Sequence, residues 1–98
     1  MLDYMEASQV AEKTARSAFG KKHVVRVFAE PGTDAEGHDA LRITIVLTPD
    51  AVENLEGDAL LKNLLDLREG LWQQGEERTP IVGYATEEEL AQSGDTES

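Results

Sequence analysis

The chain contains no cysteine and no long apolar run, and each absence excludes a class of protein. Without cysteine there is no disulfide framework, no thiolate nucleophile and no cysteine-ligated zinc, which fits a reducing compartment. No stretch of 18 apolar residues is present, and the first residues, MLDYME, lack the basic and apolar segments of a signal peptide. We therefore expect a cytoplasmic protein with no membrane partner.

Basic residues are scarce, with nine Lys and Arg against twenty Asp and Glu, for a net charge of -11. Because nucleic-acid binders gain affinity from Lys and Arg that displace counterions, this excess of acid predicts no nucleic-acid partner. Residues 1–29 nevertheless hold five of the nine basic residues, whereas residues 30–98 hold seventeen of the twenty acids. A solvated helix face explains the basic third, and a docking patch for an acidic partner is the alternative.

A chain of 98 residues makes one domain with a modest core, which leaves little room for a large substrate cleft or a cofactor. We assign residues 1–91 to a single domain. From Gln92 to Ser98 there is no large apolar side chain to bury, so residues 92–98 are expected to form a disordered acidic tail. No cofactor is expected.

The clearest pattern is the alternation over Leu41–Thr48, in which every second residue is aliphatic, as in a strand that buries one face. A helix is predicted over 4–18, ended by Gly20. The β-rich segment 23–30 predicts a second strand, antiparallel to the first. The polar, glycine-containing segment 31–40 then predicts a long hairpin loop between them.

The second half of the chain predicts further helices and one more strand. Thr48 and Pro49 are typical of a helix start, Gly57 interrupts that short helix, and Asp58 is expected to cap a longer helix that ends near Gln74. The expected apolar stripe of this helix consists of Leu60, Leu61, Leu64, Leu65, Leu67, Leu71 and Trp72. A third strand is predicted over 81–84, and a capping box beginning at Thr86 predicts a final helix of one or two turns.

These elements predict an α+β two-layer sandwich with the order αββαβ, a break in the second helix, a three-stranded sheet and helices on one face. We favour the strand order 2-1-3, with the third strand beside the first, over the alternative with the third strand beside the second. The side chains expected under the helices are Val25, Val27, Ile43, Ile45 and Ile81.

The other face of such a sheet is expected to be open and unusually apolar for a soluble monomer. Its predicted residues are Val24, Arg26, Phe28, Arg42, Thr44, Val46, Val82 and Tyr84. Homodimerisation through this face is the leading interpretation, and the alternatives are a different protein partner or a helix or tail that covers the face. Trp72 is expected to close the edge of the core, or else to anchor a partner. The candidate interaction residues are therefore Arg26, Phe28, Arg42, Thr44, Val46, Trp72 and Tyr84.

The joint between the two consecutive helices reads Glu56-Gly57-Asp58-Ala59-Leu60. The order helix, strand, strand, two helices, strand resembles the type II KH domain, which clamps nucleotides with a Gly-X-X-Gly loop at this joint. The resemblance covers the element order only, because the joint here holds one glycine and two acids. It implies RNA binding by a KH-like domain as an alternative function, which we do not carry over to this chain.

No catalytic or metal motif is recognised. The hairpin loop holds Asp34, Glu36, His38 and Asp39, but their spacing matches neither an EF-hand nor a zinc site, so a solvated acidic loop is the better interpretation. Two histidines and a few serines give no sign of a catalytic triad. We therefore predict a non-enzymatic interaction or regulatory accessory module that forms a homodimer through its open sheet face or an edge strand. An acidic antitoxin-like partner of a basic protein is one version, and a small ligand-binding or enzymatic domain with a pocket between helices and sheet is the alternative.

Overall fold

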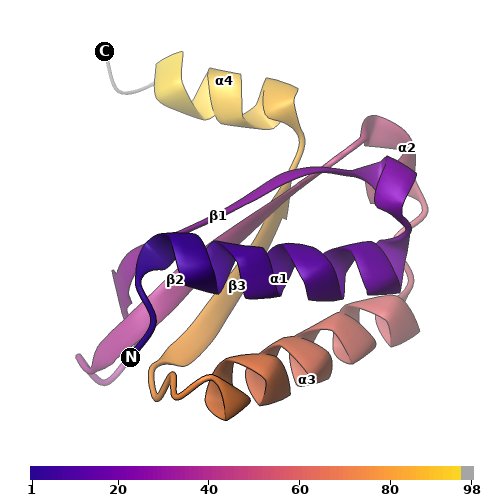
Figure 1. Ribbon diagram of the computed structural model, residues 1–98. Coiled ribbons are helices and arrows are strands. Elements are labelled where there is room, and N and C mark those ends of the chain that lie inside the picture. The colour runs from indigo at the N-terminus through magenta and orange to yellow at the C-terminus, as the bar shows by residue number, and fades with distance from the viewer. Residues whose placement is uncertain (96–98) are drawn as a thin grey trace.

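The computed structural model describes residues 1–95, which form helices and a three-stranded mixed sheet, so the predicted α+β class is confirmed (Figure 1). The described elements are α1 (Tyr4–Phe19), the 3₁₀ turn η1 (Lys21–His23), β1 (Val24–Thr33), β2 (Asp39–Leu47), α2 (Pro49–Glu53), α3 (Gly57–Gln73), β3 (Thr79–Ala85) and α4 (Glu87–Asp95).

Local sequence signals set most of the element ends. Asp3 caps α1 in a capping box with Glu6, and Gly20, at φ 95°, ends it in a conformation that glycine adopts easily. The Thr48 side chain accepts a hydrogen bond from the amide of Ala51 and so caps α2, whose first residue is proline. The predicted cap of α3 was wrong by two residues, because Glu56 occupies that position and makes no side-chain capping bond.

The strand order is β1-β2-β3, with β1 and β2 antiparallel and β3 parallel to β2. The favoured order 2-1-3 was therefore wrong, and the alternative is correct. The reason is that β2 is apolar on both faces: Ile43 and Ile45 are fully buried on one side and Val46 on the other. Such a strand belongs in the centre of a sheet, whereas Pro31 and a bulge near Val24 suit β1 to an edge.

The core lies between the sheet and the layer formed by α1 and α3 (Figure 1). Three alanines of α1 and the leucines Leu67 and Leu71 of α3 are buried there in one cluster with the aliphatic side chains of β2. The predicted stripe of α3 was too wide, since Leu61, Leu65 and Trp72 point away from the core and are more than half exposed.

The hairpin loop and the C-terminal tail that the sequence predicted both overlap regular secondary structure. The strands β1 and β2 extend through Thr33 and from Asp39, so the hairpin loop is confined to residues 34–38, where the Asp34 carboxylate accepts hydrogen bonds from the amides of Glu36 and His38. The tail predicted from Gln92 overlaps α4, which runs to Asp95, and its residues 96–98 lie outside the described residues.

Candidate interaction surface

The second face of the sheet, opposite α1 and α3, holds five of the seven residues predicted to interact. Arg26 and Phe28 of β1 lie opposite Val46 and Thr44 of β2, and Arg42 follows on the same face. Arg42 is exposed, Phe28 and Thr44 are half-buried, and Val46 is fully buried. This face is therefore less open than the sequence suggested.

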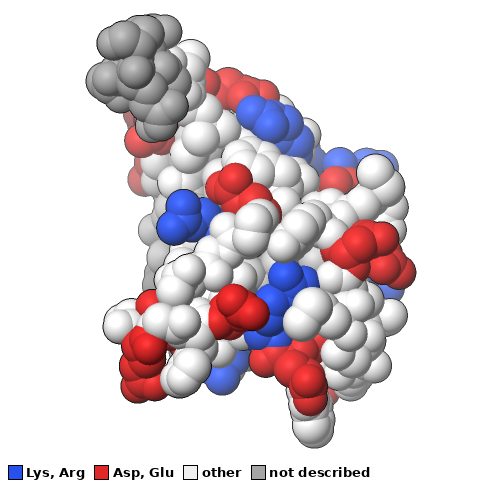
Figure 2. Space-filling model, turned by 90° about the vertical axis from the view of Figure 1, so that its left-hand side faces the viewer, with Lys and Arg blue, Asp and Glu red and all other residues white. Residues whose placement is uncertain are grey.

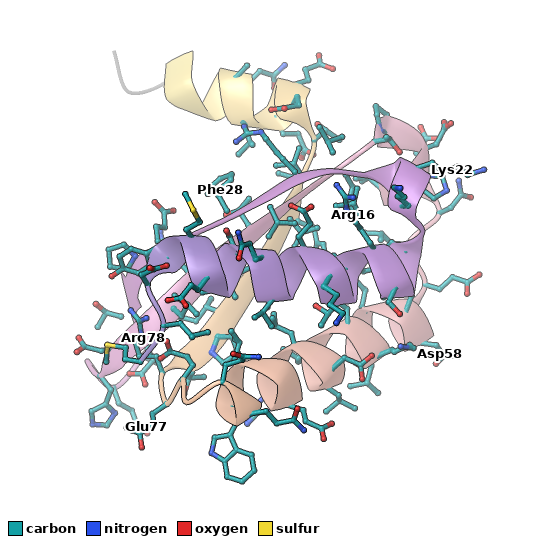
Figure 3. The ribbon with its side chains drawn as sticks, viewed as in Figure 1. Arg16, Lys22, Phe28, Asp58, Glu77 and Arg78 are labelled. Atoms are coloured by element: carbon teal, nitrogen blue, oxygen red, sulfur yellow. The ribbon has the colours of Figure 1, made fainter. Side chains whose placement is uncertain are left out.

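Helix α4 approaches this second face through one charged contact. The guanidinium of Arg26 donates two hydrogen bonds, of 3.0 and 2.9 Å, to the carboxylate of Glu87 in the first turn of α4. The hydrogen bonds lower the pKa of the Glu87 carboxyl and raise the pKa of Arg26. Arg26 also lies 5.1 Å over the ring of Phe28, which Figure 3 shows on the side of β1 that faces α4. Arg26 and Phe28 are thus engaged within the chain.

Tyr84 lies on the covered face instead of the second face. Its ring meets Phe19 of α1 edge to face at 5.6 Å, and its hydroxyl oxygen accepts a 3.0 Å hydrogen bond from the Asn63 amide of α3. Burial raises the pKa of the Tyr84 hydroxyl. Tyr84 therefore fixes α3 over β3 and is not available as an open-face contact.

In two strands, β1 and β3, the alternation of side chains between the two sheet faces differs from the prediction, and this explains why the predicted open face differs from the observed one. The bulge between Val24 and Arg26 turns Val24 into the core and leaves Val25 45% exposed, the reverse of the prediction. In β3, Val82 lies opposite Ile43 on the covered face, so Ile81 takes the second face. A strand of four predicted residues has no internal signal that says which of its two faces is buried.

The largest exposed apolar side chains outside the N-terminal segment gather on α3. Leu61, Leu65 and Trp72 are 56, 54 and 74% exposed. Their spacing of four and seven residues places them on one flank of the helix. Trp72 therefore does not close the edge of the core but is exposed at the surface, and its alternative role as an anchor for a partner stays a prediction.

This flank of α3 borders β3 along a seam of two clefts. The first, with a volume of about 470 Å³, is lined by Leu60, Leu61 and Leu64 of α3 and by Pro80, Val82 and Tyr84 of β3. The second, of about 430 Å³, continues past Pro80 to Arg68 and Trp72. β3 is an edge strand, because among the described residues it pairs only with β2.

We call this side the α3–β3 surface and define it by the exposed flank of α3 and the edge strand. Its residues are Leu61, Leu64, Leu65, Arg68 and Trp72 of α3, together with 79–85 of β3. None is acidic, although the chain has twenty acids, and Arg68 is the one residue that is charged at neutral pH. Acids border its Trp72 end, where Glu69 and Glu77 line the second cleft.

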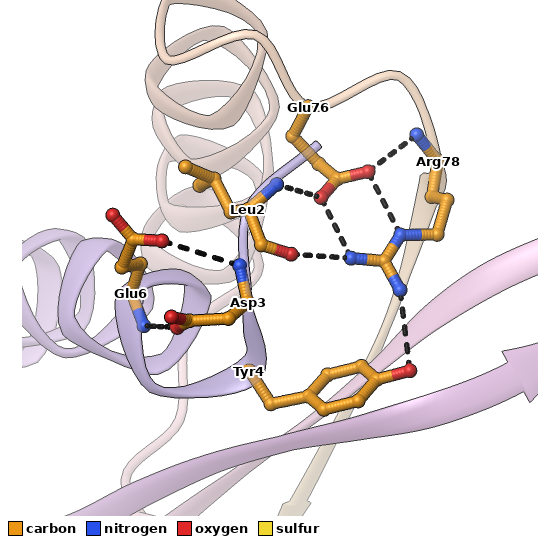
Figure 4. A network of polar contacts seen from close by, with 6 residues as sticks. All are labelled: Leu2, Asp3, Tyr4, Glu6, Glu76 and Arg78. Atoms are coloured by element: carbon orange, nitrogen blue, oxygen red, sulfur yellow. Dashed lines mark hydrogen bonds and ion pairs between the residues drawn. The ribbon is translucent and has the colours of Figure 1, made fainter.

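A buried polar network anchors the connector that leads into β3 (Figure 4). Glu76, whose side chain is fully buried, pairs with Arg78 at 2.8 Å and accepts a 3.1 Å hydrogen bond from the amide of Leu2. Arg78 also donates to the carbonyl of Leu2 and to the hydroxyl of Tyr4. The hydrogen bonds from Arg78 lower the pKa of the Glu76 carboxyl to about 2. The network ties the start of β3 to the start of α1.

The remaining polar features provide weaker evidence for a functional site. On the side of the molecule shown in Figure 2, acidic and basic side chains are dispersed among uncharged ones. A small cleft of about 230 Å³ lies between the end of α1 and the starts of α2 and α3, beside His23 and Asp50. Within residues 1–95, no three histidine or acidic side chains gather as metal ligands. Among the helices of the same residues, none has the length and hydropathy needed to span a membrane.

Comparison with known proteins identifies no family: no family model, curated protein or solved structure matches this chain.

Proposed function

We propose that this chain is a non-enzymatic protein-interaction module, of the kind that serves as a regulatory or accessory subunit. Its contact surface is the α3–β3 surface. The observation that carries the proposal is that Leu61, Leu65 and Trp72 are exposed together on one flank of α3, beside a strand with no charged side chain, in a chain with a net charge of -11. Exposed apolar clusters of this kind mark interaction sites, and tryptophan is enriched among the residues that dominate binding.

The second sheet face is a weaker candidate than the sequence suggested. Val46 is buried, Arg26 is paired with Glu87, and Tyr84 lies on the other side of the sheet. Phe28 and Ile81 remain its partly accessible large apolar side chains. A partner gains less from covering two such side chains than from covering three exposed ones beside an apolar cleft.

Position-specific photocrosslinking in the cells that produce the protein tests the proposal. The photoreactive residue p-benzoylphenylalanine would replace Leu65 on the α3–β3 surface or, as the matched control, Phe28 on the second face. We expect crosslinks to a polypeptide of defined mass from position 65 and none from position 28. Crosslinks from position 28 alone would contradict the proposal and restore the second sheet face as the contact surface.

RNA binding in the manner of a type II KH domain is the second candidate, and the element order of α1 to β3 supports it. The joint between α2 and α3 opposes it, because residues 49–60 hold Asp50, Glu53, Glu56 and Asp58 and no basic residue. Four acids at the loop that should hold phosphates repel the ligand. A filter-binding assay with single-stranded RNA at low salt is expected to give no retention, and tight binding would reverse this ranking.

A further inference from the structure

We infer that the occupant of the α3–β3 surface is a second copy of this chain, whose β3 pairs antiparallel with the first to give one continuous six-stranded sheet. This inference rests on the proposed function, since it names the partner of the same surface. It is carried by the charge distribution, by the nature of the β3 edge and by the position of the α3 flank relative to that edge.

Charge selects this surface for self-association. Two copies that each carry a net charge of -11 repel one another, so they approach most easily where acids are few. On the α3–β3 surface, β3 has no charged side chain and α3 contributes Arg68, while the carboxylates of Glu69 and Glu77 are confined to the Trp72 end. A basic partner would gain more from acidic regions, such as the joint between α2 and α3, than from this side.

The edge strand supplies a backbone that is ready to pair. β3 spans seven residues without a charged side chain, and Pro80, which lacks an amide hydrogen, is its second residue. Alternate residues of an edge strand direct N–H and C=O groups outward, which makes the strand a template for another chain. A two-fold axis perpendicular to the sheet places β3 antiparallel to its own copy, so that one patch meets itself.

The same axis brings the two α3 helices onto the same face of the joined sheet. The exposed flank with Leu61, Leu65 and Trp72 then faces its copy across the axis, beside the seam between α3 and β3. Side chains on the covered face of the added strand point toward the cleft lined by Leu64 and Val82. Strand pairing and apolar burial thus act on one side of the chain.

Light scattering of the purified chain at micromolar concentration measures self-association. We expect twice the mass of one chain. Leu65→Asp on the α3 flank and Ile81→Lys on β3, whose side chain lies on the second face but at the edge where the two strands meet, should each raise the dissociation constant at least about 30-fold, the weakening expected when one interface hot spot is lost. Phe28→Asp, on the second face, is the matched control and should remain dimeric, with circular dichroism confirming that each variant is folded. A monomeric wild-type chain, or loss of the dimer in Phe28→Asp alone, would overturn the inference.

Amide hydrogen exchange followed by NMR distinguishes strand pairing from a dimer held by α3 alone. The outward-facing amides of β3 should exchange slowly in the wild-type chain and rapidly in Ile81→Lys, while those on the outer edge of β1 exchange rapidly in both. A dimer with rapidly exchanging β3 amides would overturn the strand pairing and leave the proposed function intact. A monomer that still crosslinks from position 65 to another protein would overturn this inference alone.

Discussion

The two edges of the sheet are built differently, although both belong to one small domain. β1 carries a bulge after Val24, a proline at position 31 and the charged residues Arg26 and Glu30. β3 has no bulge and no charged side chain, and its proline, Pro80, is its second residue. Bulges, prolines and charges are the features by which proteins prevent edge strands from pairing with other chains. The comparison shows that β1 carries all three of these features and β3 carries only a proline near its start.

The helices beside the two edges differ in the same sense. α1 packs on the sheet through Ala7, Ala11 and Ala15, which are fully buried, and its outer side carries charged residues such as the Glu12–Arg16 ion pair. α3 buries leucines and exposes others. A helix on one face of a sheet needs an apolar stripe of about 100°, so the additional leucines of α3 are not explained by the core. The apolar surplus therefore lies on the β3 side.

The largest expected effect on the free energy of unfolding distinguishes the buried leucines of α3 from the exposed ones. Leu67→Ala removes a fully buried side chain and should lower the free energy of unfolding by about 2–5 kcal/mol. Leu65→Ala, at a position 54% exposed, should change it by less than about 0.5 kcal/mol. Urea denaturation in the Ile81→Lys background, which removes association, makes the comparison. Equal losses would show that Leu65 belongs to the core.

The second effect concerns the anchor of β3. Glu76→Gln leaves the guanidinium of Arg78, whose side chain is 10% exposed, without a carboxylate partner. We expect the free energy of unfolding at pH 7 to fall by about 3 kcal/mol, as when one partner of a buried ion pair is removed. Urea denaturation of both proteins measures the difference. Glu77→Gln, one residue away and exposed, is the control and should behave like the wild type.

The pH dependence of the same pair gives the sign of this contribution. Because the pKa of the Glu76 carboxyl is about 2 when folded, below its ordinary 4.5, its contribution is complete above pH 4.5 and is lost as the pH falls toward 2. The wild-type chain should therefore lose about 3 kcal/mol more than Glu76→Gln across this window. Parallel profiles for the two proteins would show that the Glu76–Arg78 pair contributes nothing to folding.

A third prediction, with a smaller expected effect, concerns the packing of α1 on the side of the sheet that holds β1. Ala11→Leu inserts a larger side chain where α1 lies against the sheet and the Ala11 side chain is fully buried. Overpacking should lower the free energy of unfolding by about 1–3 kcal/mol. Thermal unfolding measures the change, with Lys13→Leu on the exposed side of α1 as the control. A neutral Ala11→Leu variant would show that this side also has room to spare.

The sequence predicted the elements because their signals are local. The alternation over 41–48, the glycine at position 20 and the threonine at position 86 each act through neighbouring residues, and the corresponding elements are present. The class of fold follows from them. Strand order did not follow, because it depends on how apolar β2 is on its second face, where the buried Val46 is the main indication.

The contact surface was harder to predict than the fold. The leucines of α3 were visible in the sequence, but their number does not say which of them the core covers: Leu67 is fully buried and Leu65 is 54% exposed. The bulge after Val24 reverses which of the first residues of β1 face the core. The run of valines in the sequence gives no sign of this bulge. The sequence left two roles for Trp72, at the edge of the core or as an anchor for a partner. Its 74% exposure could not be predicted, because it depends on how α3 packs against the rest of the chain.

The smallest expected effect is that of salt concentration on the dissociation constant of the dimer, which tests whether the uncharged β3 edge is the contact. If two copies with a net charge of -11 meet at an uncharged edge, added salt screens their repulsion without breaking attractive ion pairs at the interface. We expect the dissociation constant of the dimer, measured by analytical ultracentrifugation, to fall by roughly a few-fold between about 0.05 and 0.5 M NaCl. Leu65→Asp, which adds an acid at the contact, should show a steeper fall from a weaker starting value. A dissociation constant that rises with salt would mean that ion pairs hold the dimer, and the open β3 edge would then not be the reason for association.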